Sequence, residues 1–329
     1  MKKLTCLIFY LGLISISVYG QPQLRFKSKI FKIVQFTDLH FQFRFAPDEL
    51  KGDSTLELMR YIIKKEKPNL VVLTGDLMTS EMSNLGGQEK GWEKITQPMA
   101  DLQVPFVAVM GNHDYDRNDH GLEMMEMVNK NPYSLAHDLD DTIAGAGNCF
   151  LEIKDSKGST NKWVLFFFDY AEFPKDKTLA ERIRKEQFQW YLRTSDSLKA
   201  LNDKPLPSLA FYHVPSSDFE LVKAQNSLEN KQEKRDSSKL SNELLLAFKQ
   251  QGDVLAVFVG HHHNNDYIGV IDNLCLGYGR KTGFSGSGNL ERGARIIKLY
   301  SKKRKIHTYI RTKTGRNQWY TFTQGEEYL

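Results

Sequence analysis

The sequence is poor in cysteine: it has three among 329 residues, and one of them, Cys6, lies within the first twenty residues. The two that remain, Cys149 and Cys275, exclude the disulfide framework that holds small secreted domains together. One disulfide between them and two separate buried thiols are equally compatible with the sequence. Internal repeats and low-complexity segments are absent as well, which excludes disordered and repetitive proteins.

Long apolar runs are absent beyond residue 20, so no later segment is expected to span a bilayer. The first twenty residues differ from the rest. Lys2 and Lys3 precede the apolar run 7–18, and small residues suited to cleavage follow it. This pattern predicts a secretory signal peptide at 1–20 and a mature chain that is secreted or periplasmic. The alternative is an N-terminal anchor that is not cleaved.

Charge of one sign does not dominate the sequence. The net charge of +5 falls to +3 when Lys2 and Lys3 leave with the signal peptide. A charge this small neither indicates nor excludes nucleic acid, and no protein partner can be read from it. Apolar residues make up 40% of the chain, which is enough for a sizeable core. No break in composition is visible, so 21–329 is expected to form a single domain.

The first half of the chain alternates apolar strands with amphipathic helices. Strands are expected at 31–37, 69–74 and 105–110, and helices at 54–67 and within 88–102. Strand, helix, strand, helix, strand is the pattern of a parallel sheet with crossover helices.

The second half follows the same logic, with more antiparallel character. The expected strands are 149–153, 163–169, 206–212 and 254–259, and the expected helices are 180–199 and one near 240–250. The polar segment 216–239 is expected to be a surface insertion. Short strands end the chain, and the last pair is expected to turn through 302–305.

Polar motifs follow five of these apolar strands. Taken singly, each is more often a turn, a cap or a buried core histidine than a ligand site. The succession is hard to obtain by chance, and α/β proteins place their ligand sites at the carboxyl ends of strands. The motifs are Asp38-Leu39-His40, Gly75-Asp76, Gly111-Asn112-His113-Asp114, His213 and Gly260-His261-His262-His263.

These residue types suit a pair of metal ions. Two ions about 3.5–4 Å apart need a carboxylate that touches both, together with nitrogen and oxygen ligands for each. Asp76 is the natural bridge, because its charge offsets the repulsion between the cations. A water held between the ions would lose a proton near neutral pH and become a hydroxide nucleophile.

The motif series resembles the calcineurin-like metallophosphoesterases, and the resemblance covers roughly residues 31–299. It implies an α/β fold, a four-layer α/β/β/α sandwich with the site at one edge. It also implies a metal-dependent phosphatase or phosphodiesterase that acts on a small-molecule phosphate ester with two divalent or trivalent ions (Fe, Mn or Zn).

The resemblance also assigns roles. Asp38, His40 and His263 are expected to bind the first metal, and Asp76 to bridge. The expected ligands of the second metal are Asn112, His213 and His261. His113 is expected to contact the phosphate and assist the leaving group, whereas His262 is expected to face the substrate cleft or solvent.

Further runs are similar to a branch of the family classed with the purple acid phosphatases. Two positions depart from the pattern of purple acid phosphatases proper: Thr79 stands where a tyrosine binds ferric iron, and His40 replaces a glycine. A ferric-tyrosinate centre is therefore not expected. The runs that carry the narrower likeness are 147–152, 264–267, 275–279 and 292–295.

Two other functions remain open. The same core serves nucleotidases and nucleases, because a fold does not determine its substrate. A catalytically silent metal-binding protein is the alternative from a different class. The complete ligand set together with His113 argues against it, since a silent site has no need of that histidine.

Overall fold

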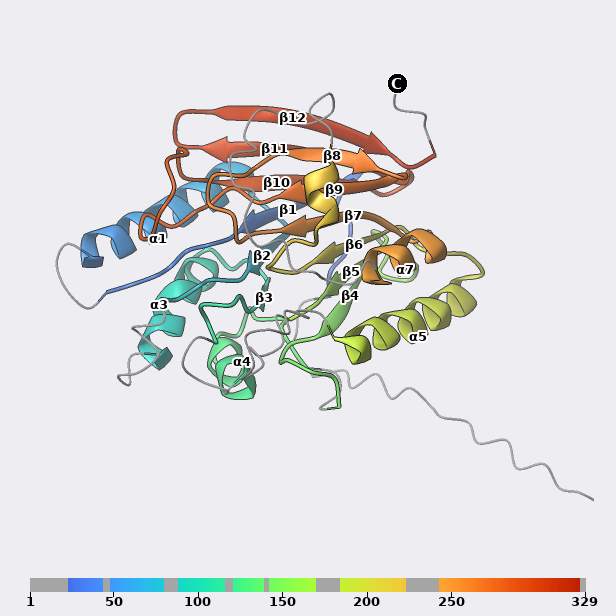
Figure 1. Ribbon diagram of the computed structural model, residues 1–329, viewed down its shortest axis with the longest axis horizontal. Coiled ribbons are helices and arrows are strands. Elements are labelled where there is room, and N and C mark those ends of the chain that lie inside the picture. The colour runs from blue at the N-terminus through green and yellow to red at the C-terminus, as the bar shows by residue number, and fades with distance from the viewer. Residues whose placement is uncertain are drawn as a thin grey trace, which may run out of the picture.

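The computed structural model describes residues 23–43, 48–79, 88–115, 121–138, 142–169, 184–222 and 243–325. The expected signal peptide lies outside these residues. The described chain forms two six-stranded sheets that lie face to face, with helices on both outer sides (Figure 1). None of the described helices is long and apolar enough to cross a membrane.

The first sheet combines N-terminal and C-terminal strands in the order β12-β11-β10-β1-β2-β3. β1, β2 and β3 pair in parallel, as the alternation of strands and helices predicted, and β10 to β12 add antiparallel strands at the other side. The strands are β1 (Ile30–Phe36), β2 (Leu70–Thr74), β3 (Phe106–Val109), β10 (Gly293–Tyr300), β11 (Lys305–Thr312) and β12 (Arg316–Thr323).

The second sheet has the order β4-β5-β6-β7-β9-β8. Its central strands β5, β6, β7 and β9 run parallel, and the two edge strands β4 and β8 pair antiparallel. The strands are β4 (Cys149–Lys154), β5 (Asn161–Phe167), β6 (Ser208–Phe211), β7 (Val254–Val259), β8 (Ile268–Ile271) and β9 (Leu274–Tyr278).

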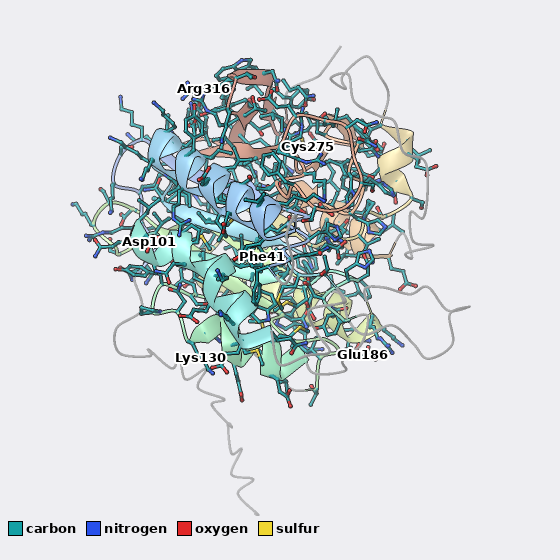
Figure 2. All side chains as sticks on the ribbon, turned by 90° about the vertical axis from the view of Figure 1, so that its left-hand side faces the viewer. Phe41, Asp101, Lys130, Glu186, Cys275 and Arg316 are labelled. Atoms are coloured by element: carbon teal, nitrogen blue, oxygen red, sulfur yellow. The ribbon has the colours of Figure 1, made fainter. Side chains whose placement is uncertain are left out.

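Helices complete a sandwich of four layers. α1 (Asp48–Glu66), α3 (Gln88–Asp101) and α4 (Gly121–Asn129) cover the first sheet, and Figure 2 views the molecule from their side. α5 (Lys185–Asn202) and α7 (Glu243–Gln251) cover the second sheet (Figure 1). The expected α/β/β/α fold is therefore confirmed.

The strands of the second sheet are buried on both faces. In β5, Leu165 and Phe167 pack into the core shared with the first sheet, whereas Val164 and Phe166 pack against the helices. A strand buried on both sides has no polar face, which explains its continuous apolar sequence.

The structure differs from the sequence predictions in three helical segments. α1 begins at Asp48 rather than at residue 54. α4 was not predicted at all. The polar segment expected as a surface insertion begins with the short helix α6 (Asp218–Leu221), where Phe219 is fully buried. Residues 223–239 of that segment lie outside the described chain.

The final hairpins also differ from the sequence prediction. Residues 301–304 connect β10 to β11, and the last hairpin of the described residues turns at 313–315, between β11 and β12. Arg304 in the first of these turns donates hydrogen bonds to the carbonyl groups of Pro205 and Gly252. The basic turn is thus partly anchored to the second sheet.

Cys149 and Cys275 are buried free thiols. They lie on β4 and β9, and three strands separate these two in the sheet. At about 4.8 Å per strand, that separation is far beyond the reach of a disulfide. Of the two possibilities that the sequence left open, the separate thiols are the one found.

Candidate metal centre

The carboxyl ends of β1, β2 and β3 in one sheet meet those of β6 and β7 in the other. Main-chain hydrogen bonds join the segments that follow: the amide of Asp38 donates to Gly75, and that of Gly260 donates to His213. The five polar motifs therefore converge on one edge of the sandwich. They bring together the candidate ligands Asp38, His40, Asp76, Asn112, His213, His261 and His263.

Four of these residues form a first group: Asp38, His40, Asp76 and His263. One ligand atom of each lies within 4.8 Å of the others. The Nε2 atoms of His40 and His263 are 2.9 Å apart, and His263 Nε2 is 3.6 Å from Asp38 Oδ1. Two imidazole nitrogens and two carboxylates aimed at one point form a donor set that suits a transition-metal ion.

A second group consists of Asp76, His213 and His261. The Nε2 atom of His213 lies 3.1 Å from Asp76 Oδ2. Asp76 belongs to both groups, so one carboxylate faces both potential metal positions. No other described residue is shared between two such groups.

Orphaned polar atoms at the same place fit a metal ion. Asn112 Oδ1 and His261 Nδ1 are buried and have no hydrogen-bond partner. Asn112 follows Gly111, which packs closely against Asp76 and the ring of His213. Burying a polar atom without a partner costs about 1–3 kcal/mol. A bound cation would satisfy these atoms, so the residues present fit the metal pair.

The backbone of the site is held in an unfavourable conformation. A positive φ is uncommon outside glycine and costs about 1–3 kcal/mol where it is strained. The surrounding hydrogen bonds maintain it; the amide of His40, for example, donates to the carbonyl of Asp76 at 2.9 Å. The residues concerned are Asp38 (φ 52), His40 (φ 43), Asp76 (φ 50) and His261 (φ 75).

Hydrogen bonds behind the candidate ligands orient their side chains. His213 Nδ1 donates to the carbonyl of Thr74 at 2.7 Å, which turns Nε2 toward Asp76. The hydroxyl of Thr37 donates to Asp38 Oδ2 at 2.8 Å. Such outer contacts determine ring orientation and tautomer in metal sites, so the groups are preorganised.

Electrostatics keep most of the donors in the form that binds metal. Burial lowers the pKa of His40 and of His261 to about 3, so both rings are neutral at physiological pH. Burial also opposes protonation of His213, but the charge and hydrogen bond of Asp76, the charge of Asp38 and the hydrogen bond to Thr74 together outweigh burial and raise the pKa of His213 to about 9. Metal binding must therefore displace a proton from His213.

His113 lies beside the two groups and belongs to neither. Its amide donates to Asp76 Oδ1 at 2.9 Å, and its ring packs edge-on against that of His40, with 5.2 Å between the centroids. The histidine expected to contact the phosphate is thus next to the candidate metal positions.

The expectation for His262 was wrong. Its side chain is buried rather than turned toward the cleft or solvent. Its Nδ1 lies 2.9 Å from the hydroxyl of Tyr278, and the two rings are stacked 5.7 Å apart. The ring of His262 thus packs against Tyr278 of β9, and its centroid lies 5.0 Å from that of the His261 ring.

Two carboxylates that were given no role hold the loops of the site in place. Asp114 accepts hydrogen bonds from the amides of Leu77 and Gly111, at 2.9 and 2.8 Å, and so joins the loops after β2 and β3. Asp169, which follows β5, accepts from the amide of Met110 at 2.9 Å and from the hydroxyl of Tyr115. A carboxylate at a strand end was the available signal for Asp169.

Three of the four runs that suggested the narrower likeness, 264–267, 275–279 and 292–295, contribute to one buried network. Asp266 forms an ion pair with Arg280 and accepts from Gln318 at 2.6 Å. The buried guanidinium of Arg295 donates to the carbonyl groups of Asp266 and Tyr278, both at 2.5 Å. These residues connect the segment after His263 to the strands β9 and β10.

Replacing Gly260 by alanine is expected to damage the site. The new Cβ would lie 2.0 Å from the hydroxyl oxygen of Thr37 and 2.8 Å from Asp38 Oδ2. Overpacking of this kind costs about 1–3 kcal/mol or more, and here it displaces a candidate ligand. Thermal unfolding and metal titration would measure both effects. Gly315→Ala is the control, because a Cβ at that turn meets nothing within 4 Å. Unchanged metal affinity in Gly260→Ala would contradict this packing.

Comparisons with known proteins agree with this geometry. Residues 31–265 match the profile of the family described as "Calcineurin-like phosphoesterase". The Arabidopsis thaliana protein named "Probable inactive purple acid phosphatase 29" is 30% identical, over 84% of this chain and 78% of the relative. "Phosphatase DCR2" of Saccharomyces cerevisiae is 27% identical, over 89% of this chain and 55% of its own length.

The fold has a solved counterpart. The crystal structure of a dimetal phosphatase from Danio rerio superposes with a TM-score of 0.64 at 13% identity, and the match covers 91% of this chain and all of that one. At this identity the likeness concerns the fold alone. The family profile covers well over half of the chain, at the residues that converge on the site. The chain therefore belongs to the calcineurin-like phosphoesterase family.

Proposed function

We propose that this protein hydrolyses phosphate esters at a dinuclear metal centre. The observation that carries the proposal is the sharing of Asp76 by two groups of candidate ligands. In this assignment Asp38, His40 and His263 hold the first metal, and Asp76 bridges the pair. The remaining ligands, those of the second metal, are Asn112, His213 and His261.

The residues of the chain have different roles in this proposed reaction. When bound, a metal pair supplies Lewis-acid polarisation of the phosphoryl oxygen and a hydroxide nucleophile. Asp38 and Asp76 contribute the negative charge that keeps two cations close together. His113, beside the pair, is placed to donate a proton or a hydrogen bond to the leaving oxygen, which needs either as its bond to phosphorus breaks.

The rival proposal is a silent metal-binding protein. Three Arabidopsis thaliana relatives, at 26 to 30% identity, carry the word "inactive" in their names. In this chain the candidate ligands lie together and His113 is beside them. The position of His113 favours catalysis, because metal binding alone requires only the ligands.

Turnover separates the two proposals. The purified protein would be loaded with manganese, iron or zinc and assayed with phosphomonoesters, phosphodiesters and nucleotides. Hydrolysis that depends on metal and disappears in Asp76→Ala supports the enzyme. Protein that binds two ions per chain and turns over none of these substrates supports the silent site.

We also propose that residues 1–20 direct export and that the rest of the chain is one domain. The continuous core between the two sheets supports the single domain, because strands from both ends of the chain contribute to it. N-terminal sequencing of the protein recovered from outside the cytoplasm tests the export. An N-terminus at Met1 in that fraction would contradict cleavage.

Iron-loaded protein is expected to lack a strong colour. Thr79 replaces the tyrosine that a ferric-tyrosinate centre needs. The nearby phenol of Tyr115 already donates to Asp169, and burial together with that carboxylate raises the pKa of Tyr115 well above its usual value. A visible spectrum of iron-loaded protein beside manganese-loaded protein is the measurement. A strong band found only with iron, and lost in Tyr115→Phe, would show that this phenolate binds iron after all.

A further inference from the structure

The segment between β9 and β10 runs beside the first group of candidate ligands. Residues 283–292, here called the glycine–serine loop, read Gly-Phe-Ser-Gly-Ser-Gly-Asn-Leu-Glu-Arg. A Cβ on Gly286 would lie 3.5 Å from the ring of His40, and the hydroxyl of Ser287 lies 2.9 Å from His263 Nδ1. The loop therefore forms a wall of the site on the side of the first metal.

Hydrogen bonds hold the glycine–serine loop at several points. The amide of Phe284 donates to the hydroxyl of Thr55 at 3.1 Å, and that of Asn289 donates to Asn264 Oδ1 at 2.7 Å. Arg280 Nη1 donates to the carbonyl of Glu291 at 2.7 Å. A loop held in this way presents its side chains in a defined geometry, so ordering costs little when a ligand binds.

Arg292 ends the loop with its guanidinium folded back over it. Nη1 donates to the carbonyl of Leu290 at 3.0 Å, and Nη2 to that of Gly288 at 2.9 Å. Gly288 has φ +110, and a Cβ there would lie 2.9 Å from the Cβ of His263 and 3.3 Å from Arg292 Nη1. The guanidinium and a candidate ligand thus flank the same glycine, where any side chain would intrude between them.

The charge of Arg292 has no carboxylate partner among the described residues. None of the ion pairs found there includes it, although its side chain is only partly exposed. Burial and the charge of Arg280 lower the pKa of Arg292, and the charge of Asp38 raises it. The guanidinium is linked to the site by Gly288, which lies between it and His263. A guanidinium has five N–H donors, and those not used by the two carbonyls remain for an anion.

We propose that Arg292 binds a non-bridging oxygen of the substrate's phosphoryl group and makes the site selective for phosphomonoesters. This inference rests on the proposed function, because it places a phosphoryl group at the metal centre. A monoester has three non-bridging oxygens and a diester has two. Two metal ions can engage two of these oxygens, and the third, which only a monoester has, is then left for Arg292.

Inorganic phosphate is the probe that tests the binding without turnover. Calorimetric titration of the manganese-loaded protein with phosphate is expected to show binding about 10- to 100-fold weaker in Arg292→Ala, which is the usual effect of a lost charge-assisted hydrogen bond. Arg292→Lys keeps the charge without the planar fork and should lie between the two. Metal content should stay at its wild-type value in both variants, and thermal unfolding should show that both remain folded.

Arg304→Ala is the matched control. Arg304 is also partly buried and also donates to main-chain carbonyls, those of Pro205, Gly252 and Asp253, but it lies in the β10–β11 turn at the opposite end of β10. Its replacement should leave phosphate binding unchanged. An equal loss of binding in Arg304→Ala, or wild-type binding in Arg292→Ala with two metals bound, would overturn the assignment.

A comparison of a phosphomonoester with a phosphodiester as substrates tests the selectivity. The value of kcat/KM for a phenyl phosphomonoester should fall in Arg292→Ala about as much as phosphate binding, while that for the matching methyl diester should change little. Equal losses for both esters would contradict the monoester preference. Wild-type protein that binds phosphate but hydrolyses neither ester would contradict the proposed function instead, and the phosphate titration would still decide the role of Arg292.

Discussion

Replacing Asp76 by alanine is expected to remove both hydrolysis and stable binding of the metal pair. One carboxylate serves both groups of ligands, so its loss leaves neither complete. Without it the two cations would also face each other with one less negative charge between them. Metal per chain after desalting, measured by plasma mass spectrometry, should fall from two toward zero, and turnover should fall to background.

Two further variants make this test specific. Asp76→Asn keeps the shape and one oxygen donor while losing the charge, so it should bind metal more weakly than wild type and more strongly than Asp76→Ala. Asp155→Ala removes a partly exposed carboxylate from the turn between β4 and β5 and should keep two ions. An Asp76→Ala protein with two bound metals and wild-type turnover would contradict the bridging role.

Much of the site could be predicted because its residues are local to strand ends. In a parallel sheet the carboxyl ends share one edge, so a polar residue just after an apolar strand is placed by the strand itself. Asp38 follows β1, Asp76 follows β2 and His261 follows β7 in this way. The apolar runs that mark the strands also mark the core, since burial on both faces removes the polar residues from them.

The residues that were missed depend on contacts between distant segments. His262 is buried because its ring stacks on the ring of Tyr278, which lies sixteen positions later on β9. Arg292 and Ser287 reach the site through a loop that follows no strand end of the motif series, and their place beside His263 comes from the pairing of β10 with β1. Local patterns carry no information on such contacts.

The four-layer fold shows the same difference between features that local patterns predict and features that depend on distant contacts. The strand–helix alternation predicted the parallel half of each sheet. The pairing of β10 with β1 joins residues that are far apart in the sequence. It also brings the glycine–serine loop next to His40. That pairing is determined by the apolar faces of both strands together, such as Ile33 against Ile297, rather than by either strand alone.

His113→Ala is expected to behave differently from Asp76→Ala. The ring of His113 lies outside both ligand groups, so two metals should remain bound. Turnover should nevertheless fall by roughly 10²–10⁴, the usual contribution of a positioned acid or base. Metal analysis and steady-state kinetics on the same sample provide both values. His307→Ala, on β11, is the matched control and should change neither.

The leaving group provides the sharper test of this role. An alkyl alcohol leaves as a poor anion and needs a proton in the transition state, whereas a nitrophenolate leaves readily without one. The loss in His113→Ala should therefore be large for an alkyl phosphate and small for a nitrophenyl phosphate. If His113 only oriented the phosphate, both substrates would lose the same factor. A loss of metal equal to the loss of activity would mean that His113 is a ligand, and that the division of roles proposed here is wrong.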